Sequence, residues 1–272
     1  MTVMADDPYI HGHDESVVAH HEQRTAAEAA AFLLPFLKRD LRVLDIGCGP
    51  GSITLGLAEA VAPGEVVGID VSAAVIERAW STARAKKVAN VNFRVGNIYE
   101  PGGDIGTFDV VYAHQVLQHL SRPMEALDVT RRLLRPSGLL GIREGDYSTR
   151  ALWPPDPRLD RFYEIYYAVA RRNGGEPAAG RRLRQWLLGA GFTDLRITTS
   201  NWTFGTPEAT RRWGDSWATR TVESDLAAQA IAYGVATSSE LEEIASAWRE
   251  WGSNPGAFYS ITHVEGVGWR PG

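Results

Sequence analysis

Cysteine is almost absent from this sequence: Cys48 is the only one in 272 residues. A lone cysteine excludes an internal disulfide framework, and it excludes any metal cluster built from cysteine ligands. It also fits a reducing compartment, so we expect a cytoplasmic protein.

Long apolar runs and basic blocks are missing as well. Charge or glycine interrupts every apolar stretch well short of the roughly 20 residues that span a bilayer. Residues 1–23 are polar and rich in histidine and acid, unlike the basic and then apolar order of a signal peptide. The net charge is −5 with no Lys/Arg block, which gives no footprint for a polyanion. We therefore expect neither a membrane nor a nucleic-acid partner.

What the sequence has is a regular alternation of apolar strand patterns with helical ones. The expected strands are 41–46, 65–70, 91–96, 108–113 and 138–144, and the expected helices between them are 52–61, 73–86 and 123–134. Such alternation predicts an α/β fold with a Rossmann-like, doubly wound parallel sheet. Right-handed crossovers place the carboxyl ends of the strands at one edge, where ligands bind in open α/β sheets.

Outside this core the pattern is helical, with prolines at 154, 155 and 157 breaking the chain. Helical spacing over 16–38 predicts a leading helix. We expect a helical cap added to the core sheet. The expected division is an N-terminal helical cap or lid at 1–40, the cofactor-binding core at 41–147, a cap insertion at 148–180, a core helix and strand at 181–200, a second cap insertion at 201–256, and a final core strand with the tail at 257–272.

The most informative segment is the strand 43–46, which runs straight into the turn Gly47-Cys48-Gly49-Pro50-Gly51. Glycines here allow the backbone to approach a ligand closely and to turn into a helix. Asp70 ends the next strand, where a carboxylate can accept hydrogen bonds from both hydroxyls of a ribose. The pair predicts a ligand of the adenosine type.

Two cofactor classes compete for this turn. The nicotinamide dinucleotide fingerprint has glycine at its first, third and sixth positions, but the sixth position here is Ser52. Asp45 lies two residues before the first glycine, where a carboxylate can meet a cationic amino group. A dinucleotide has no such group beside its pyrophosphate, whereas the methionyl end of S-adenosylmethionine (SAM) has one.

With these residues the sequence resembles the class I SAM-dependent methyltransferases. It is similar in particular to the ubiquinone/menaquinone biosynthesis group and to bacterial secondary-metabolite methyltransferases. The likeness is clear over about 41–144 and includes the motifs at 108–120 and 133–140. The resemblance implies SAM as cofactor, S-adenosylhomocysteine as product and a small-molecule acceptor.

The resemblance also assigns cofactor contacts. It implies that Asp45 lies along the methionyl part of SAM, that Asp70 holds the ribose and that Val71 flanks the adenine. Asn97 stands where the family has an acid, and its amide oxygen can still accept the same hydrogen bond. The implied cofactor-binding residues are Asp45, Gly47, Cys48, Gly49, Gly51, Asp70, Val71, Asn97, Ile98, His114 and Gln115, with Tyr9 and Arg24 as further contacts from the leading segment.

Catalytic candidates are few, because SAM supplies the reactive group and the protein mainly aligns the acceptor. The candidates that follow strand ends are His114, Glu144 and Tyr147. His114 has an alternative role in shaping the pocket, and Glu144 has one in an ion pair with Arg143. The histidines near the N-terminus lack cysteines or closely spaced acids that would complete a ligand set, so we expect no metal site.

Aromatic residues are concentrated after residue 147, and the chain has nine tryptophans. Such rings can wall a pocket for a flat, apolar ligand or form the core of the cap. We therefore expect C-, O- or N-methylation of a small aromatic metabolite, indole- or quinone-like, in secondary metabolism. A nicotinamide-dependent oxidoreductase and a non-catalytic SAM-binding regulator are the alternatives, and a homodimer is left open.

Overall fold

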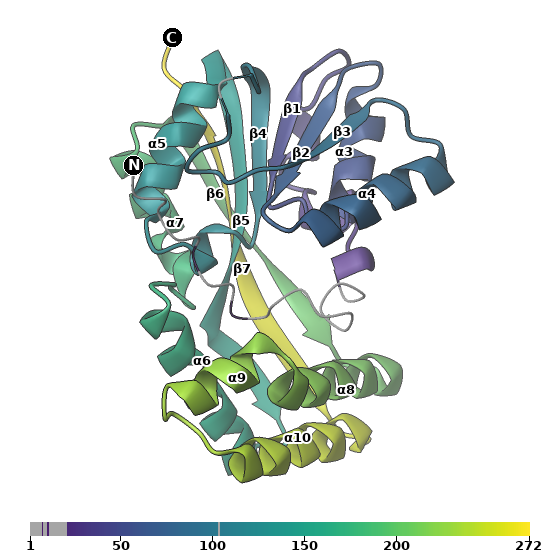
Figure 1. Cartoon of the computed structure of the whole chain (residues 1–272), viewed down its shortest axis with the longest axis vertical. Helices are drawn as coiled ribbons and strands as arrows, with labels where there is room; N and C mark the ends of the chain where they lie inside the picture. Colours follow the sequence, from purple (N-terminus) through teal and green to yellow (C-terminus); the bar gives the residue numbers. More distant parts are fainter. Residues whose placement is uncertain (1–6, 8–9, 11–20, 103) are drawn as a thin grey trace.

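The computed structural model describes residues 7, 10, 21–102 and 104–272. Its strands form a seven-stranded sheet in the order β3-β2-β1-β4-β5-β7-β6 (Figure 1). The strands are β1 Val43–Ile46, β2 Val66–Asp70, β3 Val91–Val95, β4 Phe108–His114, β5 Leu134–Trp153, β6 Thr193–Phe204 and β7 Phe258–Trp269. The first five pair in parallel, whereas β7 runs antiparallel to both β5 and β6. The Rossmann-like α/β fold is confirmed, with one antiparallel strand that the alternation did not reveal.

Helices cover both faces of the sheet. They are α2 Ala26–Ala29, α3 Ser52–Val61, α4 Ala73–Lys86, α5 Pro123–Leu133, α6 Pro157–Arg172, α7 Ala179–Gly189, α8 Pro207–Glu223, α9 Asp225–Ala232 and α10 Ser238–Ser253, with short 3-10 helices η1 Leu34–Phe36 and η2 Leu117–His119. Apolar residues of α2, α3 and α4 pack on one face, and those of α5 and α7 pack on the other. The result is a three-layer core.

Helix α4 shows how the sequence sets these elements. The side chain of Ser72 caps its first turn by accepting a hydrogen bond from the N–H of Val75. Its buried residues, Val75, Ile76, Ala79 and Ala83, recur at helical spacing and face the sheet. Basic residues in the last turn complement the helix dipole. Capping, periodicity and charge agree, and the expected range 73–86 is confirmed.

The cap is built on strands that are longer than expected. We expected the fifth strand to end at 144 and the following core strand to lie within 181–200, but β5 reaches Trp153 and β6 reaches Phe204. These extensions and the first part of β7 carry α6, α8, α9 and α10 at the end of the sheet where β1 and β4 also finish (Figure 1). The added part of β5 alternates in exposure and pairs antiparallel with β7, so it lacks the continuous apolar run of a buried parallel strand.

The leading segment differs from its expected form. In the part that is described, His21 and Glu22 are helical, and residues 23–25 and 30–33 separate them from α2 and α2 from η1, so the prediction of one helix through 38 was wrong. Pro35 lies in η1, and a proline removes a backbone N–H and crowds the preceding turn. Residues 1–6, 8, 9 and 11–20 lie outside the described residues, and this includes Tyr9 and the histidines at 11, 13 and 20.

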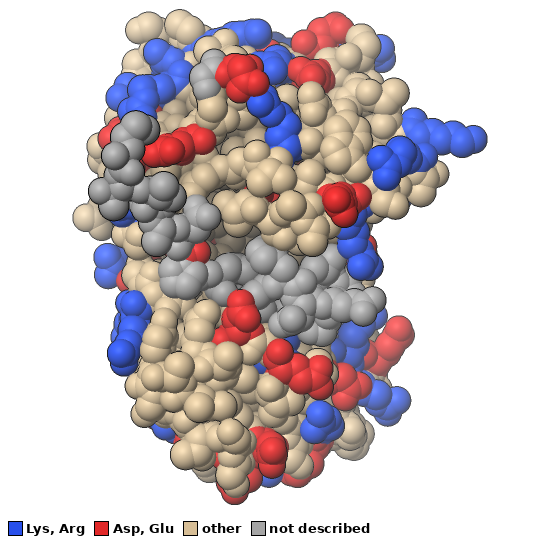
Figure 2. Space-filling model, viewed as in Figure 1, with Lys and Arg blue, Asp and Glu red and all other residues tan. Residues whose placement is uncertain are grey.

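Charges are interspersed on the surface shown in Figure 2, where neither sign gathers into one patch. Within the cap, Arg158 pairs with Glu250 at 2.7 Å and Arg161 with Glu240 at 2.8 Å, which links α6 to α10. None of the helices among the described residues combines the length and apolarity needed to cross a bilayer.

Candidate active site

The glycine turn between β1 and α3 forms one wall of a cavity. Gly47 and Gly49 have φ angles of +65° and +55°, in the left-handed region that favours glycine. A Cβ on Gly47 would lie 2.6 Å from Cγ2 of Val116, whereas a Cβ on Gly49 would meet no atom within 4 Å. Gly49 therefore presents bare backbone to open space, as close approach of a ligand requires.

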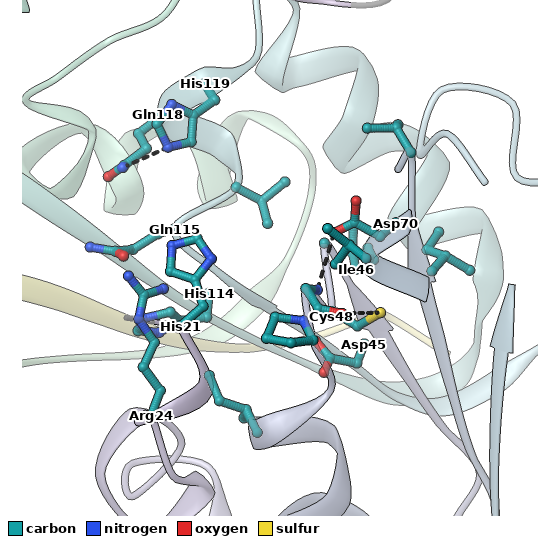
Figure 3. A pocket seen from close by; sticks show the side chains of 18 of the residues that line it. His21, Arg24, Asp45, Ile46, Cys48, Asp70, His114, Gln115, Gln118 and His119 are labelled. Atoms are coloured by element: carbon teal, nitrogen blue, oxygen red, sulfur yellow. Dashed lines mark hydrogen bonds between the residues drawn. The ribbon is translucent and has the colours of Figure 1, made fainter. Parts of the chain in front are cut away.

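Asp70, at the end of β2, is held against this turn (Figure 3). The N–H of Gly49 donates to its Oδ2 at 3.1 Å, and the N–H of Ser72 donates to its Oδ1 at 3.0 Å. Each oxygen keeps a further lone pair, so the carboxylate can still accept from ribose hydroxyls. Val71 follows it along the cavity wall and is 49% exposed, which leaves an apolar surface for a flat ring.

Asp45 is a buried carboxyl beneath the same turn. Thr54 donates a hydrogen bond to its Oδ2 at 2.6 Å. Burial, assisted by the negative charge of Asp70, raises the pKa of Asp45 to about 7. A cationic ligand group placed beside it would favour the ionised form.

Of the remaining cofactor candidates, three line the cavity and Gly51 does not. Asn97 and Ile98 line the cavity, and the Asn97 side-chain oxygen accepts from the N–H of Tyr99 at 3.0 Å. Cys48 also lines it, and burial raises the pKa of its thiol well above the usual value. Gly51 does not line the cavity; it is the N-cap of α3.

His114 ends β4 and lies in the middle of the cavity. It is 6% exposed, and among the described residues neither ring nitrogen has a hydrogen-bond partner. Burial lowers the pKa of His114 well below 6.5, and the charges of Arg24 and Arg143 act in the same direction. The imidazole is therefore neutral at physiological pH, with both nitrogens available to a bound molecule.

Gln115 follows in a left-handed turn with φ +56°. Its N–H donates to the carbonyl of Arg143 at 2.8 Å, and its side-chain amide lies 3.0 Å from Nε2 of His263. These contacts fix a conformation that is uncommon for a residue other than glycine, and such strain occurs often at functional sites.

Glu144 does not line the cavity. Its carboxylate accepts three backbone N–H groups, from Val116 at 3.0 Å, Leu117 at 2.8 Å and Gln118 at 3.2 Å. Burial raises the pKa of Glu144 to about 7. The alternative of an ion pair with Arg143 is wrong, because Arg143 pairs with Glu265. Glu144 thus holds the loop that carries the cavity wall.

Beyond His114 the cavity continues into the cap. We call this part the aromatic chamber; its walls are Tyr147, Trp202, Trp213, Trp217 and Arg220. Arg24 also lines the cavity, with its guanidinium carbon 5.1 Å from the Trp202 ring centroid. Figure 3 shows Arg24, His114 and Gln115 on one side of the cavity and Asp45, Cys48 and Asp70 on the other.

Sequence reasoning missed Arg220 altogether and left the cap aromatics unassigned. A signal was present, because residues 213, 217 and 220 are spaced four and then three apart and share one helix face. The predicted residues that the structure brings to one cavity are Asp45, Gly47, Cys48, Gly49, Asp70, Val71, Asn97, Ile98, His114, Gln115, Tyr147 and Arg24.

Known proteins are similar to this chain in sequence and in fold. Residues 37–166 match the family described as Methyltransferase domain. An uncharacterized methyltransferase of Schizosaccharomyces pombe is 33% identical over 213 residues, which cover 75% of this chain and 76% of that protein. This chain belongs to the class I SAM-dependent methyltransferases.

A second relative is similar in sequence, and a solved structure is similar in fold. A probable methyltransferase of Aspergillus luteorubrus is 29% identical over 280 residues, which cover 96% of this chain and 97% of that protein. A phosphoethanolamine N-methyltransferase of Haemonchus contortus, solved with S-adenosylhomocysteine, superposes with a TM-score of 0.56 at 16% identity and covers 90% of this chain and 52% of that one. The methyltransferase uses SAM, and the oxidoreductase and non-catalytic alternatives no longer stand.

Asp45 gives the methyltransferase a testable pH dependence. If its carboxylate pairs with the SAM amino group, binding requires the ionised form. We then expect SAM affinity to fall about tenfold per pH unit as the pH drops below the Asp45 pKa of about 7. The SAM amino group stays charged in that range, since α-amino groups titrate near roughly 7.7 to 8.0.

Calorimetric titration with SAM across this pH range measures the effect. Asp45→Asn removes the titrating group, so its SAM affinity should be weak and nearly independent of pH below 7. The same steep pH dependence in Asp45→Asn would assign the proton to another group and contradict the placement of the methionyl end.

Proposed function

We propose that the enzyme transfers the SAM methyl group to a small aromatic metabolite, indole- or quinone-like, bound in the aromatic chamber. The observation that carries this proposal is the continuity of one cavity from the glycine turn, past His114, to the three tryptophans. Resemblance to secondary-metabolite methyltransferases supports a role in secondary metabolism, and the single cysteine supports a cytoplasmic location. The cap, proposed as a separate unit that selects the substrate, supplies most of the chamber walls.

The geometry favours a flat ring as the methyl acceptor, because tryptophan side chains from two different elements line the chamber. Trp202 is on β6, while Trp213 and Trp217 lie one turn apart on α8 with their rings perpendicular and 5.6 Å between centroids. Perpendicular and offset rings attract through their quadrupoles, and a third ring can join such a cluster by either arrangement.

His114 is our candidate for contact with the reacting atom. Methyl transfer is an in-line displacement, so alignment of the acceptor contributes much of the acceleration. A neutral imidazole with two available nitrogens can accept a hydrogen bond from an acceptor O–H or N–H and hold its lone pair toward the methyl group. Its low pKa makes it a weak base, so we assign orientation to His114 rather than outright deprotonation.

Transfer of a labelled methyl group from SAM to indoles, quinols and phenols tests the proposal, with aliphatic alcohols and amines of similar size as comparison acceptors. We expect methylation of ring acceptors, and about a tenfold rise in acceptor KM in Trp217→Leu, because a stacked ring contact is lost. His114→Phe should lower the rate and leave affinity for S-adenosylhomocysteine unchanged.

Trp153→Leu is the matched control, since Trp153 is 61% exposed and does not line the cavity. Its acceptor KM should equal that of the wild type. Equal methylation of aliphatic acceptors, or a Trp217→Leu variant with unchanged acceptor KM, would contradict an aromatic acceptor in this chamber.

A further inference from the structure

A buried histidine behind the chamber has no role in the proposed function. His263 is on β7, is 0% exposed, and its ring centroid lies 4.2 Å from that of Trp202, a chamber wall. Its ring also stacks with His114, at 6.4 Å between centroids and 12° between ring planes. Since His263 does not line the cavity, it can influence a bound molecule only through a neighbour.

That neighbour is Gln115, whose side-chain amide nitrogen lies 3.0 Å from Nε2 of His263. Burial lowers the pKa of His263 well below 6.5, so the ring is neutral at physiological pH. A neutral imidazole has one N–H and one nitrogen lone pair, and an amide nitrogen can only donate. Nε2 therefore accepts from Gln115, and the ring proton resides on Nδ1.

The contact with His263 sets which end of the Gln115 amide is presented to the cavity. Gln115 lines the cavity, and among the described residues its Oε1 receives no hydrogen bond. The opposite orientation of the amide would present its N–H groups instead, and it would need a proton on Nε2 of His263. The tautomer of His263 thus determines whether a bound molecule meets a hydrogen-bond acceptor or a donor at Gln115.

The Gln115 amide lies where the cofactor part of the cavity meets the aromatic chamber. A Cβ built on Gly145 would lie 3.5 Å from the Gln115 amide nitrogen and 3.6 Å from the ring of Tyr147, a chamber wall. Figure 3 shows Gln115 on the same side of the cavity as His114, which precedes it in the sequence. The amide is therefore beside the imidazole that we assign to the reacting atom.

Two neighbouring groups at this point can each accept a hydrogen bond. We propose that the methyl acceptor carries a second O–H or N–H group beside its reacting one, and that Gln115 Oε1 accepts from this second donor. His114 then holds the reacting group, Gln115 selects for its neighbour, and His263 is the positioning residue that keeps the amide oxygen toward the cavity. This inference rests on the proposed function, since it takes a ring acceptor to bind beside His114.

The binding test compares 2,3-dihydroxynaphthalene with 3-fluoro-2-naphthol. Fluorine replaces one hydroxyl at similar size but cannot donate a hydrogen bond. Each compound is titrated calorimetrically into the full-length protein saturated with S-adenosylhomocysteine. We expect the dihydroxy compound to bind about fivefold more tightly, as one additional hydrogen bond contributes.

Variants assign this preference to its residues. Gln115→Met removes the oxygen and should bring the two affinities together. His263→Phe keeps a ring against Trp202 but removes Nε2, so the preference should fall; His263→Gln, whose side-chain oxygen can accept from the same amide, should restore it. A role of His263 in packing alone predicts the reverse order. Gln185→Met is the matched control, because Gln185 is exposed on α7 and does not line the cavity; it should keep the full preference.

The tautomer of His263 can also be measured directly in the wild type. Nitrogen NMR of histidine-labelled protein distinguishes a protonated ring nitrogen from an unprotonated one, and His263→Gln identifies the signal by its loss. We expect a neutral ring with its proton on Nδ1. A proton on Nε2 would present the amide N–H groups to the cavity and would overturn the inference. This measurement decides if the Gln115 and His263 variants fail to fold, which circular dichroism reports.

The outcomes separate the two proposals. Equal affinity for both probes in the wild type overturns the inference and leaves the aromatic acceptor standing. So does a folded Gln115→Met variant that keeps the preference, or one that loses affinity for S-adenosylhomocysteine instead, since Gln115 would then contact the cofactor. Absence of binding by either probe overturns the inference and counts against the aromatic acceptor as well.

Discussion

Replacing Asp70 with alanine is expected to weaken SAM binding about a hundredfold, because the change removes the carboxylate that we assign to both ribose hydroxyls. Hydrogen bonds to a charged group contribute about 1.5 to 3 kcal/mol each, so two of them account for an effect of this size. The variant also loses the contact from the Gly49 N–H that holds the turn against β2. Calorimetric titration with SAM and with S-adenosylhomocysteine measures the loss.

Two further variants serve as comparisons for Asp70→Ala. Asp70→Asn keeps an acceptor oxygen without the charge, so its affinity should fall between wild type and Asp70→Ala. Asp104→Ala should leave SAM affinity unchanged, since Asp104 pairs with Arg94 on the surface and does not line the cavity. Unchanged SAM affinity in Asp70→Ala would refute our placement of the ribose.

The core of the fold could be predicted because its signals are local. The glycine turn and the apolar spacing of α3 lie within residues 47–61, and the cap and apolar spacing of α4 lie within residues 72–87, so each helix is specified by its own segment. The extension of β5 could not be predicted in this way. Residues 151–153 are paired with a strand more than 100 residues later, and only that pairing makes this extension part of the sheet.

The site residues also differ in whether the local sequence could predict them. The glycine turn, Asp45 and Asp70 belong to two successive strands and the turn between them, so one stretch of sequence is enough to predict their role. The aromatic chamber instead joins Tyr147 of β5 to side chains of β6 and α8, and in the neighbouring cavity wall the contact of Gln115 with His263 spans 148 residues. The spacing of residues 213, 217 and 220 places Arg220 on the same helix face as two tryptophans, but nothing in the local sequence shows that this face is buried, which is why Arg220 was missed.

Substitution of Glu144 is expected to have the second large effect, on stability. The result distinguishes two roles for Glu144, a catalytic base and a residue that holds a loop. Glu144→Ala is expected to lower the free energy of unfolding by about 3 kcal/mol, because two buried backbone N–H groups and one that is partly buried lose their acceptor. Glu144→Gln keeps the oxygen that can serve Val116 and Leu117 and should lose roughly half as much. Urea denaturation followed by circular dichroism measures both, and Glu208→Ala, at an exposed position, should stay within about 0.5 kcal/mol of wild type.

The pH dependence of these stabilities tests the same contact. Burial raises the pKa of Glu144 from 4.5 to about 7, so between these values the folded chain binds a proton that the unfolded chain has released. This contribution to the free energy of unfolding is fully present below about pH 4.5 and is lost as the pH rises to about 7. Because Glu144→Gln cannot titrate, the stability advantage of wild type over this variant should narrow across that interval. A stable Glu144→Gln enzyme that binds SAM normally yet transfers no methyl group would instead make Glu144 the base, and the loop contacts would then be secondary to its chemistry.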